Sequence, residues 1–160
     1  MRDDLKLLGE AFRTAPRRFA RVAPDGFRIG EEIVPVLRGT IQEWTLVRKL
    51  FRKGRVACSS RDGVEGAGAE RCASCKREGC SPRIRLRIHP APGGGLDAPD
   101  LELELNFSSC RNFLDYAREL AAAHLEVHEA VTVFSVLDRA KWGEVRFASD
   151  RQPSECRQEA

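Results

Sequence analysis

Arg83-Ile84-Arg85-Leu86-Arg87-Ile88 alternates between arginine and a branched apolar residue, and Leu101-Glu102-Leu103-Glu104-Leu105 repeats the alternation with glutamate. Successive side chains of a β-strand point to opposite faces, so each stretch predicts a strand with one apolar and one charged face. If the two strands pair as a hairpin, both apolar faces meet the core, and the arginine and glutamate rows share the outer face. The sequence leaves open whether the three arginines bind phosphate or pair with the glutamates.

Further strands are predicted on both sides of this hairpin. Residues 33–47 are rich in β-branched and aromatic residues, over a length that exceeds an ordinary strand. Gly39 in the middle predicts a bulge or bend, which lets one strand serve two sides of a curved sheet. Residues 130–137 and 142–147 predict two more strands joined by a turn. These segments indicate a mainly β fold.

Residues 108–122 predict one helix, because apolar residues recur there at helical spacing behind two serines that are good N-caps. We expect the apolar stripe of this helix to face the core. The stripe comprises Cys110, Phe113, Leu114, Ala117 and Leu120. We also assign Phe107, Phe134 and Phe147 to the core.

Four of the six cysteines lie close together in the sequence, as Cys58, Cys72, Cys75 and Cys80. The C-x2-C pair lets two thiolates from one tight turn take adjacent corners of a zinc tetrahedron, and closed sites of four thiolates are structural. We therefore expect these four cysteines to hold one structural Zn²⁺. A redox pair and the disulfides of a secreted domain are the alternatives, although a redox pair normally opens a helix after a strand.

At 160 residues, with 42% hydrophobic residues, the chain fits one ordered domain. Its net charge is only +3, but residues 1–60 hold 13 Lys and Arg against 7 Asp and Glu. We expect a short helix and a basic arm over 1–30, a folded domain over 31–149 with the zinc insert at 56–82, and a loose tail over 150–160. The alternative for the arm is a solvated linker. Without an apolar signal run or a membrane-spanning stretch, we expect a cytoplasmic protein with no membrane partner.

The elements run as a long bent strand, a zinc insert, two strands, a helix and two strands. This order is that of a five-stranded OB-like Greek-key barrel with one helix between strands 3 and 4 and a zinc knuckle after strand 1. It resembles the zinc-bearing OB domains of replication protein A large subunits and of tailed-phage helix-destabilising proteins. The string from Cys58 to Gly63, followed by the C-x2-C pair, is similar to small cysteine-bearing proteins of phages and integrating elements. The resemblance implies single-stranded DNA binding in replication, recombination or repair.

Such a barrel binds single strands with cations for phosphates and aromatic rings for bases. Residues 44–61 contain six cations and no carboxylate before the zinc loop, which makes this run the first candidate. For stacking we choose Trp44 and Trp142, each of which has barrel packing as its alternative role. The expected nucleic-acid-binding residues are Arg38, Trp44, Arg48, Lys49, Arg52, Lys53, Arg55, Arg85, Lys141 and Trp142.

Two further functions were weighed. A zinc-stapled adaptor or inhibitor uses the same fold and contacts a protein partner through the N-terminal helix, without nucleic acid. Zinc-dependent deamination requires H-x-E before P-C-x-x-C, whereas here His124-Leu125-Glu126 follows the cysteines and Arg71 precedes Cys72. We therefore expect no enzyme activity. The sequence does not decide between DNA and RNA, because recognition of a 2′-hydroxyl depends on three-dimensional geometry.

Overall fold

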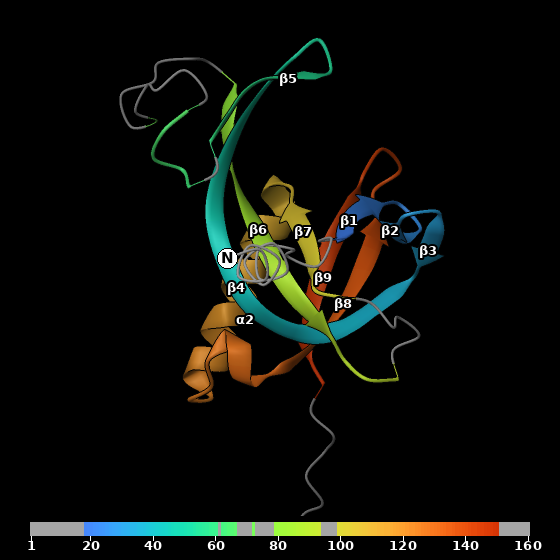
Figure 1. Cartoon of the computed structure of the whole chain (residues 1–160). Helices are drawn as coiled ribbons and strands as arrows, with labels where there is room; N and C mark the ends of the chain where they lie inside the picture. Colours follow the sequence, from blue (N-terminus) through green and yellow to red (C-terminus); the bar gives the residue numbers. More distant parts are fainter. Residues whose placement is uncertain (1–17, 61, 67–71, 73–78, 94–98, 151–160) are drawn as a thin grey trace, which may run out of the picture.

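The computed structural model of this chain describes residues 18–60, 62–66, 72, 79–93 and 99–150. Within them, nine strands form one mixed sheet in the order β3-β2-β1-β7-β6-β4-β8-β9, with β5 paired to β4 outside this path (Figure 1). The strands are β1 Arg18–Ala23, β2 Gly26–Ile29, β3 Glu32–Val34, β4 Val36–Arg52, β5 Arg55–Ser60, β6 Cys80–Pro90, β7 Leu101–Leu105, β8 Val131–Asp138 and β9 Gly143–Ser149. Between β7 and β8 lie the helix α2, Phe107–Ala122, and the short 3-10 helix η2, Val127–Glu129.

The predicted five-stranded barrel with a helix between strands 3 and 4 is wrong. The sheet has nine described strands, and α2 follows the seventh of them. The error begins in the predicted basic arm, because residues 18–34 form β1, β2 and β3 instead. β1 pairs in parallel with β7, so the outer edge of the β6–β7 hairpin is occupied by a strand from the N-terminal region. The sheet consequently continues beyond the β6–β7 hairpin.

The predicted hairpin of alternating strands is confirmed. β6 and β7 pair antiparallel, with Arg85 opposite Glu104 and Arg87 opposite Glu102. The apolar residues between them, such as Leu86 and Leu103, are fully buried. The arginine and glutamate rows therefore share one face of the sheet, and the apolar rows form its core.

The long strand is also confirmed, and it serves two parts of the sheet. β4 has 17 residues; residues 36–40 pair with β8, and residues 39–50 pair with β6 around a bulge between Ile41 and Glu43. A Cβ at Gly39 would lie 2.5 Å from the carbonyl oxygen of His89, so a side chain at this position would collide with β6. Glycine thus permits the close approach of β6 at this position, although the bulge predicted there lies between Ile41 and Glu43.

The helix is confirmed, but its buried face differs from the predicted stripe. Phe113 and Leu120 are buried as expected, whereas Leu114 is 44% exposed and Phe107 is 61% exposed, so both core assignments are wrong. Tyr116 is buried in place of Leu114, and its hydroxyl lies 2.9 Å from Thr132 Oγ1 on β8. The N-cap is Asn106, whose side chain accepts a hydrogen bond from the Ser109 amide. The helix packs against one sheet only. Leu114 follows Phe113 by about 100° of helical rotation, which places it on the side of the helix that faces solvent.

Candidate nucleic-acid interface

The charged face of the sheet gathers cations from three strands. Lys49 lies on β4, Arg83 and Arg85 lie on β6, and Arg21 lies on β1. Laterally paired residues point to the same face of a sheet, and the registers of β4, β6 and β7 place the first three of these cations on the face of Glu104, with Arg85 directly opposite it. The alternation predicted from sequence therefore produces a cluster of positive charge on one face.

Glu104 is the carboxylate at the centre of this cluster. Its Oε2 lies 2.6 Å from Lys49 Nζ and 3.4 Å from an Arg85 guanidinium nitrogen, and its Oε1 lies 3.6 Å from Arg83. One negative charge thus holds three positive charges, so the group keeps an excess of positive charge. The Nε atoms of Arg83 and Arg85 are buried and find no hydrogen-bond partner in the part of the chain that the structure describes. Buried donors of this kind are stabilised by an added acceptor.

Arg87, at the other end of the arginine row, pairs with carboxylates other than Glu104. Its Nε donates to Asp100 at 2.8 Å, and its guanidinium lies 3.7 Å from Glu43. Hydrogen bonds from His89 and Arg87 hold the pKa of Asp100 below its ordinary value. All three arginines thus pair with carboxylates, but only Arg83 and Arg85 share theirs with a lysine. Phosphate binding by these arginines stays a prediction.

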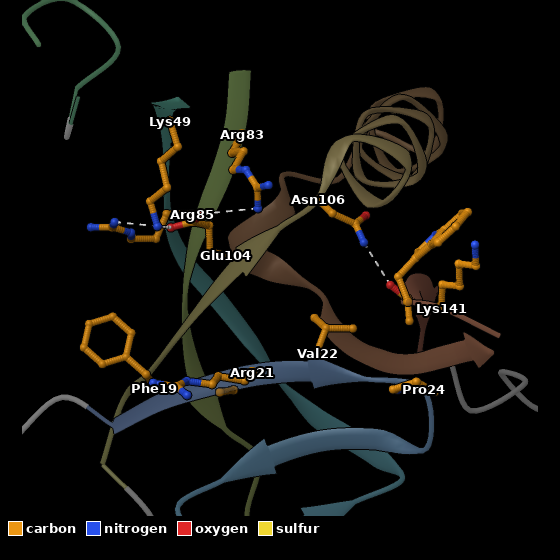
Figure 2. A pocket seen from close by; sticks show the side chains of 13 residues that line it. Phe19, Arg21, Val22, Pro24, Lys49, Arg83, Arg85, Glu104, Asn106 and Lys141 are labelled. Carbon is orange, nitrogen blue, oxygen red and sulfur yellow. Dashed lines mark hydrogen bonds and ion pairs between the residues drawn. The ribbon is translucent and has the colours of Figure 1, made fainter. Parts of the chain in front are cut away.

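A cleft of about 680 Å³ opens beside the Glu104 cluster (Figure 2). In Figure 2, Lys49, Arg83 and Arg85 converge on Glu104 at one side, while Asn106 and Lys141 lie at the other. Five cations line the cleft, and they are Arg21, Lys49, Arg83, Arg85 and Lys141. Two aromatic side chains, Phe19 and Trp142, also line it and are 59% and 49% exposed. Charge for phosphates and open ring faces for bases thus occur in one concave site.

A hydrogen-bonded turn between β8 and β9 positions Lys141 and Trp142. Asp138 Oδ1 accepts the Ala140 amide at 2.7 Å, and the Arg139 amide donates to the Trp142 carbonyl at 3.0 Å. Glu144 fixes the base of the turn by accepting hydrogen bonds from Asn112 and Arg139, both at 3.0 Å. These bonds, led by that of Asn112, lower the pKa of the Glu144 carboxyl. The ionised Glu144 carboxylate and these hydrogen bonds therefore hold the turn in place.

Gly143 brings the two walls of the cleft together. A Cβ there would lie 2.6 Å from the Ala23 carbonyl oxygen and 2.7 Å from a methyl group of Val22, both on β1. The Gly143 carbonyl accepts a hydrogen bond of 2.9 Å from the side chain of Asn106, the helix N-cap. One residue consequently joins β1, β9 and the start of α2.

Four predicted residues meet in the cleft, namely Lys49, Arg85, Lys141 and Trp142. Sequence reasoning missed Phe19 and Arg21, which line the cleft, because it assigned their segment to the basic arm over residues 1–30. The signal was present as alternation: Ala20 between them is buried, while Phe19 and Arg21 are exposed. Two prolines and the density of arginines concealed this short period-two pattern.

The other predicted residues lie elsewhere. Arg38 pairs with Asp150 at 3.4 Å, far along β4. Trp44 and Arg48 alternate with Lys49, so they point to the opposite face, where the Trp44 ring meets the edge of Phe113 at 6.2 Å. The remaining cations lie at the end of the β4–β5 hairpin, and they are Arg52, Lys53 and Arg55.

The predicted zinc ligands are only partly described. Leu50 on β4 pairs with Cys58 on β5 and with Cys80 on β6, so these two cysteines flank it on one face. Cys72 is buried, and its amide donates to the Val64 carbonyl at 2.7 Å. Cys75 lies outside the described residues. Among those described, no three His, Cys, Asp or Glu side chains gather closely enough to bind a metal. The thiolate donor set suits zinc, and the zinc site stays a prediction.

No family model, curated protein or solved structure matches this chain. In the described part of the chain, no helix has the length and apolar character needed to cross a bilayer.

Proposed function

We propose that this protein binds single-stranded nucleic acid in the cleft between β1 and the β8–β9 turn. The observation that carries the proposal is the composition of the cleft: five cations and two exposed aromatic rings around one carboxylate. Negatively charged phosphates neutralise the excess positive charge of the cleft, and unpaired bases offer ring faces that stack on Phe19 and Trp142. Each stacked base contributes about 1–3 kcal/mol in proteins of this type.

Stacking also favours a single strand over a duplex. Bases in a duplex stack on one another, so the aromatic rings of the cleft have no base face to meet. A duplex retains only the attraction between phosphates and cations. Binding to the cleft should therefore weaken strongly when a complementary strand is annealed.

The test is a titration of the purified protein with a labelled single-stranded DNA, its annealed duplex and the RNA of the same sequence. The proposal expects tight binding to a single strand and at least about fivefold weaker binding to the duplex, which corresponds to the loss of one stacked base at about 1 kcal/mol. Equal affinity for the single strand and the duplex would reduce the interaction to general attraction between charges. The RNA arm of the experiment decides which sugar the cleft prefers.

A second candidate function is protein binding on the opposite face of the sheet. Trp44 and Leu46 lie there two residues apart and are 54% and 45% exposed, which is unusual for large apolar side chains. The predicted partner element, the N-terminal helix, lies outside the described residues. An absence of binding to every oligonucleotide would favour this function.

We also propose that Cys58, Cys72, Cys75 and Cys80 hold a structural zinc at the base of the β4–β5 hairpin. The support is the donor chemistry and the position of Cys58 and Cys80 on the two strands beside Leu50. A zinc there would tie the hairpin to β6, because its ligands come from both β5 and β6. Its role would be to stabilise the hairpin rather than to react.

A further inference from the structure

Beyond the cleft, β4 and β5 form a projecting hairpin that we call the arm and define as residues 48–60; it is distinct from the basic arm predicted over residues 1–30. In Figure 1, β4 and β5 extend together away from α2. Arg52 pairs with Arg55, and the two residues between them, Lys53 and Gly54, have φ values of 48° and 74°. Two consecutive positive φ values are typical of the tight two-residue turns that match the twist of paired strands. The arm therefore ends in a defined turn.

The tip of the arm has the same kinds of residue as the cleft. A second hollow, of about 700 Å³, is lined by Phe51, Arg52, Lys53 and Arg55. Phe51 is 42% exposed, so its ring is accessible. Within the described residues, the three cations at the tip form no ion pair, in contrast to the cations around Glu104. An aromatic ring beside three unneutralised cations suits one nucleotide with its flanking phosphates.

One contact joins the tip to the cleft. The guanidinium carbon of Arg83 lies 5.0 Å from the centre of the Phe51 ring, within the range of a cation–π contact. Arg83 lines the cleft, and Phe51 lines the hollow at the tip. Phe51 lies two residues after Lys49 on the same face of β4, about 7 Å along the strand, and Arg52 ends the strand beside it. A short strand of nucleic acid therefore reaches Phe51 without leaving the face that lines the cleft.

We infer that the tip of the arm is a second nucleotide subsite, and that a sufficiently long single strand occupies the cleft and the tip together. This inference rests on the proposed function of the cleft. Once a strand is bound in the cleft, its free end is held near the tip at a high effective concentration. Affinity should consequently rise in a step when the strand becomes long enough to reach Arg52 and Lys53.

The experiment uses labelled oligo-dT probes from about 4 to about 16 nucleotides, the span of site sizes known for small single-strand-binding domains. The full chain is compared with the triple variant R52A/K53A/R55A and with the control Arg38→Ala, which removes a cation paired to Asp150 far from both sites. The triple variant should bind the shortest bound probe like the unchanged protein and lose about tenfold or more on the longest. Arg38→Ala should match the unchanged protein at every length.

A second variant separates stacking from charge at the tip. Phe51→Ala should lower affinity for long probes while leaving the salt dependence unchanged, because stacking releases no counterions. Weakening by the triple variant that is equal at all lengths would overturn the subsite and leave a general electrostatic effect. If the triple variant binds every probe as tightly as the unchanged protein, the subsite is overturned and the proposed function stands. Failure of the unchanged protein to bind any probe would overturn both.

Discussion

The cleft and the tip of the arm carry similar residues, but they differ in how their cations are paired with carboxylates. In the cleft, Lys49, Arg83 and Arg85 surround Glu104 at 2.6 to 3.6 Å, so their positions are fixed before a ligand arrives. At the tip, Arg52, Lys53 and Arg55 form no ion pair with the described residues. Fixed groups lose less entropy on binding, whereas unpaired cations keep their full charge for a phosphate. The comparison suggests a positioned primary site and a more adaptable second one.

Removing the predicted zinc should separate the two regions most strongly. We expect one zinc per chain, and structural zinc sites in small domains contribute about 10–16 kcal/mol. Cys75→Ser should therefore release the metal and disorder the base of the arm, while the cleft retains its fold and its short-probe binding. Elemental analysis and amide hydrogen exchange measure this. The control is Cys110→Ala, since Cys110 lies on the buried face of α2. A metal-free folded protein, or loss of zinc in this control, would contradict the assignment.

Two glycines provide a matched test of how much each region depends on packing. Gly143→Ala places a methyl group within 3 Å of β1, so it should cost about 1–3 kcal/mol of stability and weaken binding in the cleft. Gly54→Ala meets no atom within 4 Å and adds only backbone strain at a φ of 74°, about 1–2 kcal/mol. Chemical denaturation compares the two variants, and titration with a short probe tests the cleft. Unchanged cleft binding by a folded Gly143→Ala protein would show that the wall is not needed.

The two tryptophans test which face of the sheet binds the ligand. Trp142→Ala should lower single-strand affinity by about 1–3 kcal/mol and leave the salt slope unchanged, as expected for the loss of stacking. Trp44→Ala removes an equally exposed ring from the opposite face and should leave affinity unaltered. Fluorescence anisotropy at several salt concentrations measures both. The reverse result would move the binding site to the face that carries Trp44.

Glu104→Gln should give the smallest effect and the opposite sign. Its carboxylate competes with a phosphate for the same three cations, so its neutralisation should raise affinity several-fold. The salt slope should steepen by up to about 0.7, because one further cation is free to release a counterion. The tip has no such carboxylate among the described residues. A weaker complex would mean that Glu104 serves mainly to hold the cations in place.

The sequence revealed local structure well and long-range pairing poorly. The alternation of Arg83 to Ile88 and the helix after Asn106 depend on neighbouring residues, and both are confirmed in the structure. The bulge predicted at Gly39 lies two residues further on, between Ile41 and Glu43. The parallel pairing of β1 with β7 joins residues about eighty positions apart, and no local pattern specifies it. The predicted barrel failed at this point.

The candidate site shows the same difference between what local patterns predict and what depends on long-range pairing. Lys49 and Arg85 were selected from their charge alone, and the structure places both in the cleft. Phe19 and Arg21 enter the cleft only because β1 pairs with β7, so their role depends on the contact that the sequence did not show. Trp44 was selected for its position beside the basic run. The register with β6 places its side chain on the face opposite Lys49, outside the cleft.

The most direct test of the account is the salt dependence of single-strand binding by the double variant K49A/R85A, with the short probe that fills only the cleft. If both cations contact phosphates, the slope of log affinity against log salt should become shallower by about 1.4 relative to the unchanged protein. Arg118→Ala, which removes a cation paired with Asp115 on the exposed surface of α2, should leave the slope unaltered. A correctly folded double variant with unchanged affinity and slope would contradict the assignment of the cleft as the nucleic-acid-binding site.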